Sequence, residues 1–349
     1  MGSSIFNSSA YGRITPRPWG KVFLQGLLLT AVFFTLWEIS GRALGFKPTV
    51  FDNYQLWSSI LTRALEVDEQ SLIFIGASRN QADIHIPTIR RNLSTFFPAQ
   101  LSTGNGSPLP ALELIADYTT FRGTLVIDVM PSRMFTSVDQ HRKLGPDFSW
   151  PKRYQAELNS QSPPIISGLE LEMSLLLQET FILVSGVLGP PVLLDAFKSA
   201  TFPTPRFYWI TRDRLQVFDY SLIESDLERY RQSNTFGHYR WNKLINEALL
   251  SRIEWIHQKV TKILDRGGRI IFLRFPVKGG VLESELARFP DNEYWDVFAA
   301  GVGGQFVNAN KISSLSQFKI TDGDHIDSEF ASRFTEFLIE YLNLKPINS

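Results

Sequence analysis

Three short runs of apolar residues, each bounded by glycine or proline, set the strongest constraint on how this chain can fold. Uninterrupted apolar runs of this length are typical of strands buried on both faces, as in a parallel sheet. Segments with apolar residues at helical spacing separate them, at residues 108–119 and 240–265. This alternation predicts a doubly wound α/β domain with a mainly parallel sheet. The runs are "SLIFIGAS" (71–78), "GTLVIDVMP" (123–131) and "GGRIIFLRFP" (267–276), with a weaker fourth, "GQFVNAN" (304–310).

A longer apolar segment, residues 22–40, precedes this domain. At about 1.5 Å per helical residue it can just cross a bilayer of about 30 Å, so we expect one transmembrane anchor. Arg13, Arg17 and Lys21 precede the segment and no acidic residue does, which favours a cytoplasmic N-terminus, residues 1–21. The main domain would then lie on the extracytoplasmic, periplasmic side. A cleaved signal peptide and a buried core helix are the alternatives.

The rest of the chain divides into four parts. Residues 41–70 are predicted to be a linker with a short helix, residues 71–135 the first part of the core, and residues 238–345 the second part. Residues 136–237 interrupt the alternation and are interpreted as an insertion, a lid or a partner surface. Within the insertion we expect a hairpin around Arg212 and Asp213. The apolar stretch 175–189 has glutamates close by, so it is predicted to be a buried or amphipathic helix and not a second span.

Composition excludes several classes of protein. Lys and Arg total 35, as do Asp and Glu, so the basic excess of a nucleic-acid-binding protein is missing. The chain has no cysteine, which excludes thiol nucleophiles, disulfides and thiolate metal sites. It has neither a phosphate-binding Gly-Lys-Ser/Thr loop nor a His-Glu-x-x-His motif. We therefore expect no cofactor, no metal and no nucleic-acid partner.

Ser78 is the first candidate for chemistry. It follows the first predicted strand in "FIGASRN" (74–80), and doubly wound sheets present their functional groups where strands end. Backbone N–H groups of such a turn can hold an oxyanion. The alternative is a serine that merely caps the next helix.

The second candidate is "TDGDHIDSEF" (321–330), which contains one of only five histidines in the chain. Asp322 lies three residues before His325 and can accept the imidazole N–H, leaving the other ring nitrogen free to take a proton from a serine. Asp324 is close enough in sequence to compete for the histidine, and a metal site from these residues with Asp327 is a further alternative. Asp327 is also placed to cap the C-terminal helix.

These two blocks resemble those of the SGNH/GDSL hydrolase superfamily. Its first block is an apolar strand ending in Gly-x-Ser, and its last is Asp-x-x-His before the final helix. The resemblance implies a three-layer sandwich with Ser78 as nucleophile, His325 as general base and Asp322 as its orienting acid. Two features depart from the family, since Ala77 replaces the usual Asp and the third-block strand (124–133) has no oxyanion asparagine. For oxyanion and substrate binding the resemblance leaves Arg79, Asn80, Gly104, Asn105 and Gly106.

Membrane-tethered members of this superfamily add or remove acyl groups on bacterial envelope polysaccharides. The resemblance therefore implies an acyl-ester hydrolase or O-acyltransferase that works through an acyl-enzyme on Ser78. The expected partners are an acylated glycan or other ester, the bilayer through residues 22–40, and a multispanning acyltransferase. The alternatives are a catalytically inactive accessory protein of an envelope complex and a soluble cytoplasmic esterase.

Overall fold

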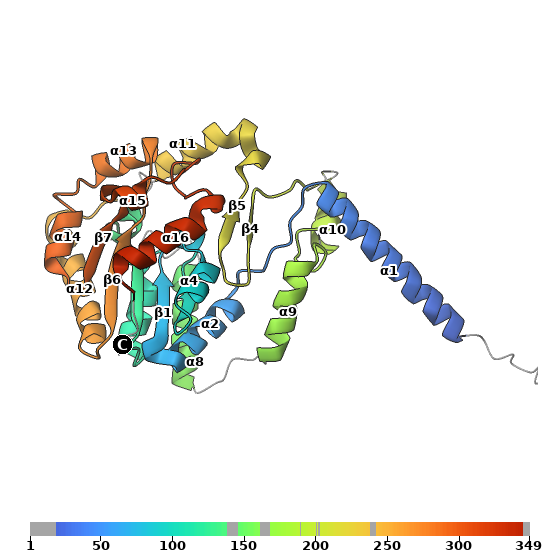
Figure 1. The fold of residues 1–349 in the computed structure, drawn as a ribbon, viewed down its shortest axis with the longest axis horizontal. Coiled ribbons are helices and arrows are strands. Elements are labelled where there is room, and N and C mark those ends of the chain that lie inside the picture. The colour runs from blue at the N-terminus through green and yellow to red at the C-terminus, as the bar shows by residue number, and fades with distance from the viewer. Residues whose placement is uncertain are drawn as a thin grey trace, which may run out of the picture.

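The computed structural model describes residues 19–137, 146–160, 168–188, 190–199, 201, 203–237 and 242–344. Five parallel strands form the central sheet in the order β2-β1-β3-β6-β7 (Figure 1). Four of them lie in the four predicted runs, so the α/β class with a mainly parallel sheet is confirmed. The strands are β1 (Ser71–Ile75), β2 (Phe97–Gln100), β3 (Thr124–Asp128), β6 (Arg269–Arg274) and β7 (Gln305–Asn308).

Strand β2 was not predicted from the sequence. It is short, it contains Pro98 and it ends at the polar Gln100, so it lacks the apolar run that marks the other strands. Proline removes a ladder donor and is tolerated at the edge of a sheet, and β2 is an edge strand that pairs only with β1.

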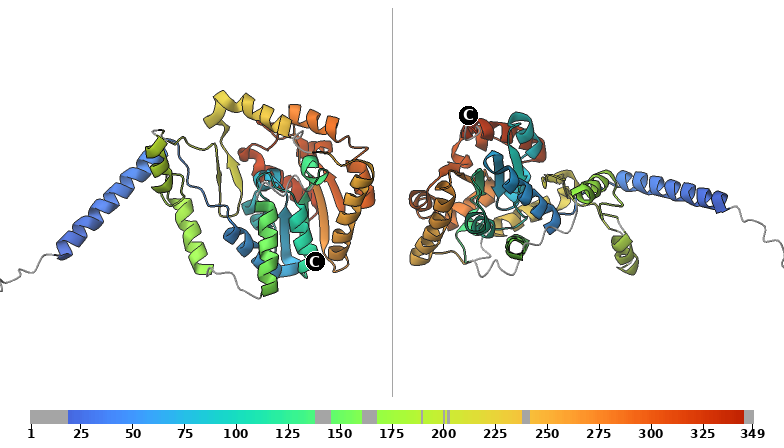
Figure 2. Two further views of the ribbon diagram at one scale, coloured as in Figure 1. Left: turned by 180° about the vertical axis from the view of Figure 1, so that it is seen from behind. Right: turned by 90° about the horizontal axis from the view of Figure 1, so that it is seen from below.

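Helices cover both faces of the sheet (Figures 1 and 2). Side chains of Ile73, Leu125 and Phe272 belong to a core shared with α2 (Tyr54–Val67), α5 (Leu109–Tyr118), α12 (Asn246–Leu264) and α14 (Trp295–Gly301). The alternate side chains of Phe74, Val126 and Ile271 point to the opposite face and pack on α4 (Ile86–Asn92), α15 (Ser313–Ser316) and α16 (Ser328–Leu342). The remaining short elements are α3 (Ser78–Asp83), α6 (Pro131–Met134), α13 (Gly279–Arg288), η1 (Asp68–Gln70) and η4 (Ala309–Lys311).

One helix in the described part of the chain, α1 (Trp19–Ala43), is long and apolar enough to span a membrane. Its 25 residues include an 18-residue window of mean hydropathy 1.8, none of which is buried. The helix extends about three residues beyond each end of the predicted anchor. Of the predicted cytoplasmic segment 1–21, residues 1–18 lie outside the described residues.

The insertion consists of separate elements that pack on different parts of the sheet domain, with residues 146–160 against α5 and residues 227–237 against α13 (Figure 1). The predicted hairpin is present, with three antiparallel pairs around the turn at residues 211–215. The segment after α1 is more than a linker, because the Val50 N–H donates to the Ile210 carbonyl at 2.8 Å and α2 buries Trp57 and Leu61 in the core. The insertion's elements are α8 (Pro146–Ser160), α9 (Gly168–Thr180), α10 (Pro190–Ser199), β4 (Tyr208–Ile210), β5 (Gln216–Phe218), η2 (Tyr220–Asp226) and α11 (Leu227–Gly237).

Candidate active site

Ser78 stands where β1 turns into α3, at the carboxyl edge of the sheet. β1 lies between β2 and β3, which is the position where the strand order reverses and where such sheets place their ligands. The turn requires Gly76, which has φ +150°, because a Cβ there would lie 2.3 Å from the Asp128 side chain. Ser78 is half-buried while the residues on either side of it are buried. The backbone therefore presents this hydroxyl at the end of a rigid strand.

The structure brings Ser78 together with His325 and Asp322, from opposite ends of the chain. His325 Nε2 lies 2.9 Å from Ser78 Oγ, and His325 Nδ1 lies 2.7 Å from Asp322 Oδ2. An ionised carboxylate can only accept hydrogen bonds, so Nδ1 carries a proton; in the neutral form of the ring Nε2 is then left to accept from the serine hydroxyl. Ser78 is the first residue of α3, and Ala77 occupies the N-cap position of that helix. Ser78 is therefore not the N-cap residue.

The loop before α16 holds Asp322 rigidly. Asp322 Oδ1 accepts the backbone N–H groups of Asp324 and His325, at 2.9 and 2.8 Å, which leaves Oδ2 for the imidazole. Two oxygens on one carboxylate thus fix both the loop and the ring. This explains the spacing of three residues between the acid and the histidine.

Asp324 does not compete for the same ring nitrogen. Its Oδ1 accepts from Arg79 Nε and Nη2 at 2.8 and 2.6 Å, while its Oδ2 is 3.7 Å from His325 Nε2. Asp327 lies at the N-cap position of α16 without capping it, because its carboxylate accepts from the Thr321 N–H and hydroxyl. Within the described residues, no group of three or more His, Asp or Glu side chains is arranged to hold a metal ion.

The carboxylates around His325 control its protonation. Burial disfavours the imidazolium, but the charges of Asp322 and Asp324 outweigh burial and raise the pKa of His325 to about 9. Asp83 adds to this rise, and its own pKa is raised well above the usual range by burial. Asp83 Oδ1 accepts the Ile326 N–H at 2.9 Å. The histidine is thus protonated in the resting site near neutral pH and becomes a base as the pH rises.

The candidate oxyanion residues separate into two groups. The Arg79 and Asn80 side chains are fully buried and have other partners: Arg79 pairs with Asp324 and Glu285, and Asn80 donates to the Ile75 carbonyl. Both side chains are therefore held in the interior of the domain by these partners.

The loop after β2 supplies the other group. Its Thr103 N–H donates to the Gly76 carbonyl at 3.1 Å, so the loop lies beside the turn that carries Ser78. Gly104 and Asn105 are exposed, with Asn105 in the left-handed region at φ +60°. The Gly106 N–H donates to the Thr103 carbonyl and serves the turn itself. Asn105 Oδ1 accepts from Arg133 Nη2 at 3.3 Å, so the exposed part of this loop is Gly104 and the rest of Asn105.

Asp128 occupies the end of the third-block strand, where the sequence lacks the expected asparagine. Its Oδ2 accepts the Ala77 N–H at 3.1 Å, one residue before Ser78. Burial raises the pKa of Asp128 to about 7, although the nearby Arg79 guanidinium opposes this rise. The carboxyl group therefore fixes the turn that presents the serine.

Residues of the insertion complete the site. These contacts were not predicted from the sequence. The Phe218 ring in β5 lies 4.8 Å from the His325 ring, and the Phe218 N–H donates to Ser328 Oγ at 2.7 Å. Asn234 Nδ2 in α11 donates to Asp322 Oδ2 at 3.3 Å. Burial, followed by the Asp322 charge, raises the pKa values of Tyr220 and Tyr230 far above the ordinary value. The sequence carries no local signal for these contacts, because the partners are about 90 or more residues apart.

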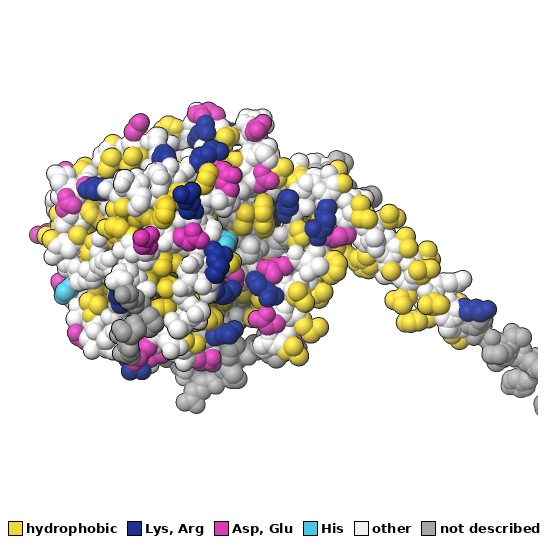
Figure 3. Space-filling view, in the orientation of Figure 1, with side chains coloured by type: hydrophobic (Ala, Val, Ile, Leu, Met, Phe, Trp, Pro, Cys, Tyr) yellow, Lys and Arg dark blue, Asp and Glu magenta, His cyan; other side chains and the backbone are white. Residues whose placement is uncertain are grey.

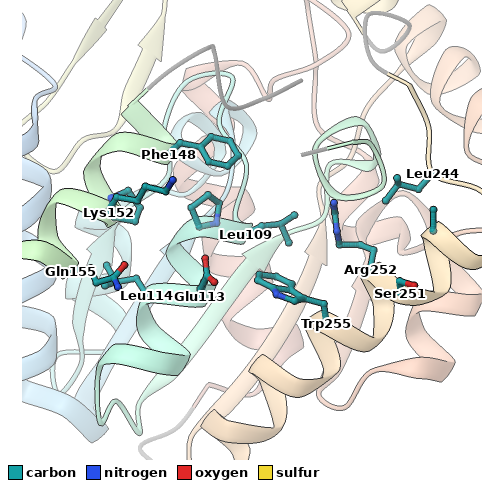
Figure 4. Close-up of a pocket in the computed structure, with 13 residues that line it drawn as sticks. Leu109, Glu113, Leu114, Phe148, Lys152, Gln155, Leu244, Ser251, Arg252 and Trp255 are labelled. Atoms are coloured by element: carbon teal, nitrogen blue, oxygen red, sulfur yellow. The ribbon is translucent and has the colours of Figure 1, made fainter. Parts of the chain in front are cut away.

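A separate cavity of about 530 Å³ lies between α5, α8 and α12 (Figure 4). Apolar side chains form most of its wall, and Lys152 and Arg252 line it from opposite helices. Arg252 Nη1 donates to the Met134 and Thr136 carbonyls. Ser78, His325 and Asp322 do not line this cavity, so it is separate from the candidate active site. The other lining residues are Leu109, Pro110, Glu113, Leu114, Phe148, Pro151, Gln155, Leu244, Ala248, Ser251 and Trp255.

No protein-family model matches this sequence, and no curated protein matches it.

Proposed function

We propose that the protein is a membrane-anchored serine acyl-ester hydrolase or O-acyltransferase with an SGNH-type doubly wound sandwich. The observation that carries the proposal is the hydrogen-bonded series from Ser78 Oγ through both nitrogens of His325 to Asp322. A serine, a base and an orienting acid in this order are the requirements of nucleophilic acyl transfer. The sheet order and the position of Ser78 after β1 support the SGNH-type assignment.

The proposed reaction has two steps. Ser78 Oγ attacks the ester carbonyl as His325 Nε2 takes the hydroxyl proton, and collapse of the tetrahedral intermediate releases the alcohol with that proton. Water or a sugar hydroxyl then attacks the acyl carbonyl and gives its proton to His325. His325 returns a proton to Ser78 Oγ as the serine ester bond breaks, and the acyl group leaves as a carboxylic acid or as a sugar ester. The first acceptor makes the protein a hydrolase and the second makes it a transferase.

Backbone N–H groups at the start of α3, together with Gly104 and Asn105, are the proposed oxyanion donors. Ser78, Arg79 and Asn80 occupy the first turn of α3, where N–H groups have no partner within the helix. This arrangement would replace the asparagine missing from the third-block strand. It is consistent with the Arg79 and Asn80 side chains pointing into the core.

The expected substrate is an acylated polysaccharide of the cell envelope, reached from the extracytoplasmic face. Support for the location comes from α1 and from the basic residues that precede it. A multispanning acyltransferase in the same membrane is the proposed partner that would deliver acyl groups. This part of the proposal rests on the resemblance to anchored SGNH proteins.

An inactive accessory protein is the second candidate. The observation that favours it is the shortage of oxyanion side chains, because Arg79 and Asn80 are held in the core and the third block offers Asp128 in place of an amide. Losing one oxyanion donor typically costs about 2.7–4 kcal/mol of transition-state stabilisation. An accessory protein would keep the fold and use the insertion as its working surface.

Labelling with a fluorophosphonate tests the proposal on the full chain in detergent micelles. An activated serine displaces fluoride from the probe, and mass spectrometry locates the resulting phosphorylated residue. We expect the adduct on Ser78, lost in Ser78→Ala and His325→Ala and retained in the control Ser221→Ala, an exposed serine of the insertion. Folded protein that takes up no label would contradict the enzyme and favour the accessory protein.

A further inference from the structure

Helix α9 carries an exposed apolar face that nothing in the described structure covers. Leu169, Met173, Leu176 and Leu177 recur at helical spacing and are 72%, 57%, 58% and 41% exposed. Phe181 and Val184, in the turns that follow α9, are 43% and 40% exposed. We call these six residues the α9 stripe. An apolar face this continuous marks a surface that contacts something other than water.

The other side of α9 already has its partners. Leu171 and Leu175 pack with Val50 and Leu56, and Gln178 Oε1 accepts the Phe51 N–H at 2.7 Å. The polar flank is also engaged on the protein side, where Glu179 pairs with Arg212 at 2.9 Å. The inner face and the polar flank therefore hold α9 on the domain, and the stripe is left pointing outward.

The stripe lies next to the end of the anchor. Glu38 Oε2 accepts the Ile182 N–H at 3.0 Å, and Arg42 Nη2 donates to the Thr180 carbonyl at 2.7 Å. The side chains of Phe46, Ile182 and Leu188 form a small core at this junction. The last turns of α1 and the C-terminal end of α9 are thus tied together at one level (Figure 1). Figure 3 shows hydrophobic side chains along α1 and again on the outer side of the helix beside it.

We propose that the α9 stripe lies on the surface of the same bilayer that α1 crosses, with its side chains in the boundary between headgroups and acyl chains. Continuity favours lipid as the occupant, because the stripe adjoins the point where the apolar surface of α1 ends. Between Met173 and Val184 the one charged residue is Glu179, and it pairs with Arg212 on the domain. Glu170 borders the face in the first turn of α9, where a helix lying along the surface keeps it among the headgroups.

Two cations near the junction fit this placement. Arg42 ends α1 and Lys47 follows it, and both are exposed at the level where lipid phosphates would lie. The domain would therefore contact the membrane at two points, α1 and α9. This fixes its orientation, whereas a single anchor would leave the domain free to rotate above the bilayer. The inference is independent of the chemistry proposed for Ser78.

The test measures lipid contact at single residues of the full chain. Because the natural sequence has no cysteine, Met173→Cys and Leu176→Cys each give a single site for an environment-sensitive fluorophore. The matched control is Leu250→Cys on α12, which is 57% exposed, against 58% for Leu176, and is remote from α1 in sequence. Each protein is reconstituted alone in phosphatidylcholine vesicles with a lipid that carries a nitroxide quencher high on its acyl chain.

We expect the nitroxide lipid to quench labels at residues 173 and 176 strongly and the label at residue 250 little. Quenching at residue 176 no greater than at residue 250 would overturn the proposal. Fluorescence at residue 176 that depends on the protein-to-lipid ratio and not on the quencher would also overturn it, and would assign the stripe to a second copy of the chain. Because the vesicles contain no other protein, quenching cannot come from a multispanning partner.

Discussion

At the scale of single residues, Asp322 and Asp324 lie two positions apart and act on His325 in different ways. Asp322 fixes the ring through Nδ1, whereas Asp324 is bound to Arg79 and affects His325 through its charge. Asp322→Asn would place an amide N–H against Nδ1 and leave the proton on Nε2, the nitrogen that must accept from Ser78. We expect fluorophosphonate labelling to slow by about 10⁴-fold, the cost of the wrong tautomer. Asp324→Asn keeps the Nδ1 contact and should retain most of the labelling rate above about pH 9; an equal loss in both variants would contradict this division of roles.

The raised pKa of His325 gives the site a predicted pH dependence. The protonated ring cannot accept a proton, so labelling of Ser78 should rise about tenfold per pH unit from about pH 6 and level off near the pKa. That pKa is about 9. Asp83, Asp322 and Asp324 face the ring, so Asp324→Asn should move the plateau to lower pH.

The folded state also stabilises the charged ring, which adds to the free energy of unfolding. This contribution is complete below about pH 6.5 and is lost as pH rises through the pKa of His325 in the folded protein. A flat labelling profile across this range would contradict a buried imidazolium at rest.

At the scale of elements, the hairpin β4–β5 controls the environment of His325 through one aromatic ring. Phe218→Ala would remove the ring that lies 4.8 Å from the imidazole and admit water. Water screens the neighbouring carboxylates, so we expect the plateau of the labelling profile to move down toward the ordinary histidine pKa. Phe207→Ala is the control, since Phe207 stacks on Phe218 at 5.8 Å without contacting His325 in the described structure. If both variants moved the plateau alike, the effect would belong to the aromatic cluster and not to the Phe218 ring.

A buried ion network connects α3, α13 and the loop that carries the catalytic candidates. Arg79 is fully buried and binds Asp324 and Glu285, each at 2.6 Å. Arg79→Met would leave two buried carboxylates without this partner, which typically costs about 3–5 kcal/mol of unfolding free energy. Arg91→Met, at an exposed pair with Glu336, should cost about 0–1 kcal/mol. Urea unfolding of the full chain in detergent measures both, and similar values for the two variants would contradict a structural role for the network.

The sequence predicted those elements whose signal is local. The strands β1, β3, β6 and β7 are apolar runs, and α5, α12 and α16 have regular apolar faces, so a few neighbouring residues suffice to recognise each. Strand β2 was not predicted because Pro98 and Gln100 interrupt any apolar run. Its place at the edge of the sheet depends on pairing with β1, which the local sequence does not show. Ser78 and His325 could be foreseen because each sits beside its own strand or helix. Phe218 and Asn234 could not, since only the folded insertion brings them to His325 and Asp322.

At the scale of the whole molecule, the insertion contacts both α1 and the candidate active site. Its 180–188 segment is hydrogen-bonded to Glu38 and Arg42 of α1, and the Ile210 carbonyl of β4 accepts the Val50 N–H in the segment after α1. The same hairpin places Phe218 on His325. Anchor, insertion and site are therefore parts of one contact network. The insertion therefore links α1 to the candidate active site, which is a structural role distinct from that of a lid.

The side of the membrane on which this network lies can be tested with the same cysteine-free background. Basic residues precede the apolar part of α1, and membrane proteins usually keep such residues in the cytoplasm, so we expect the domain outside. In spheroplasts of a bacterial host, a membrane-impermeant maleimide should label Leu250→Cys on the exposed surface of α12. Ser4→Cys, in the N-terminal segment, should react only after lysis. The reverse pattern would place Ser78 in the cytoplasm, away from any envelope polysaccharide, and labelling of both sites only after lysis would make the protein a cytoplasmic esterase.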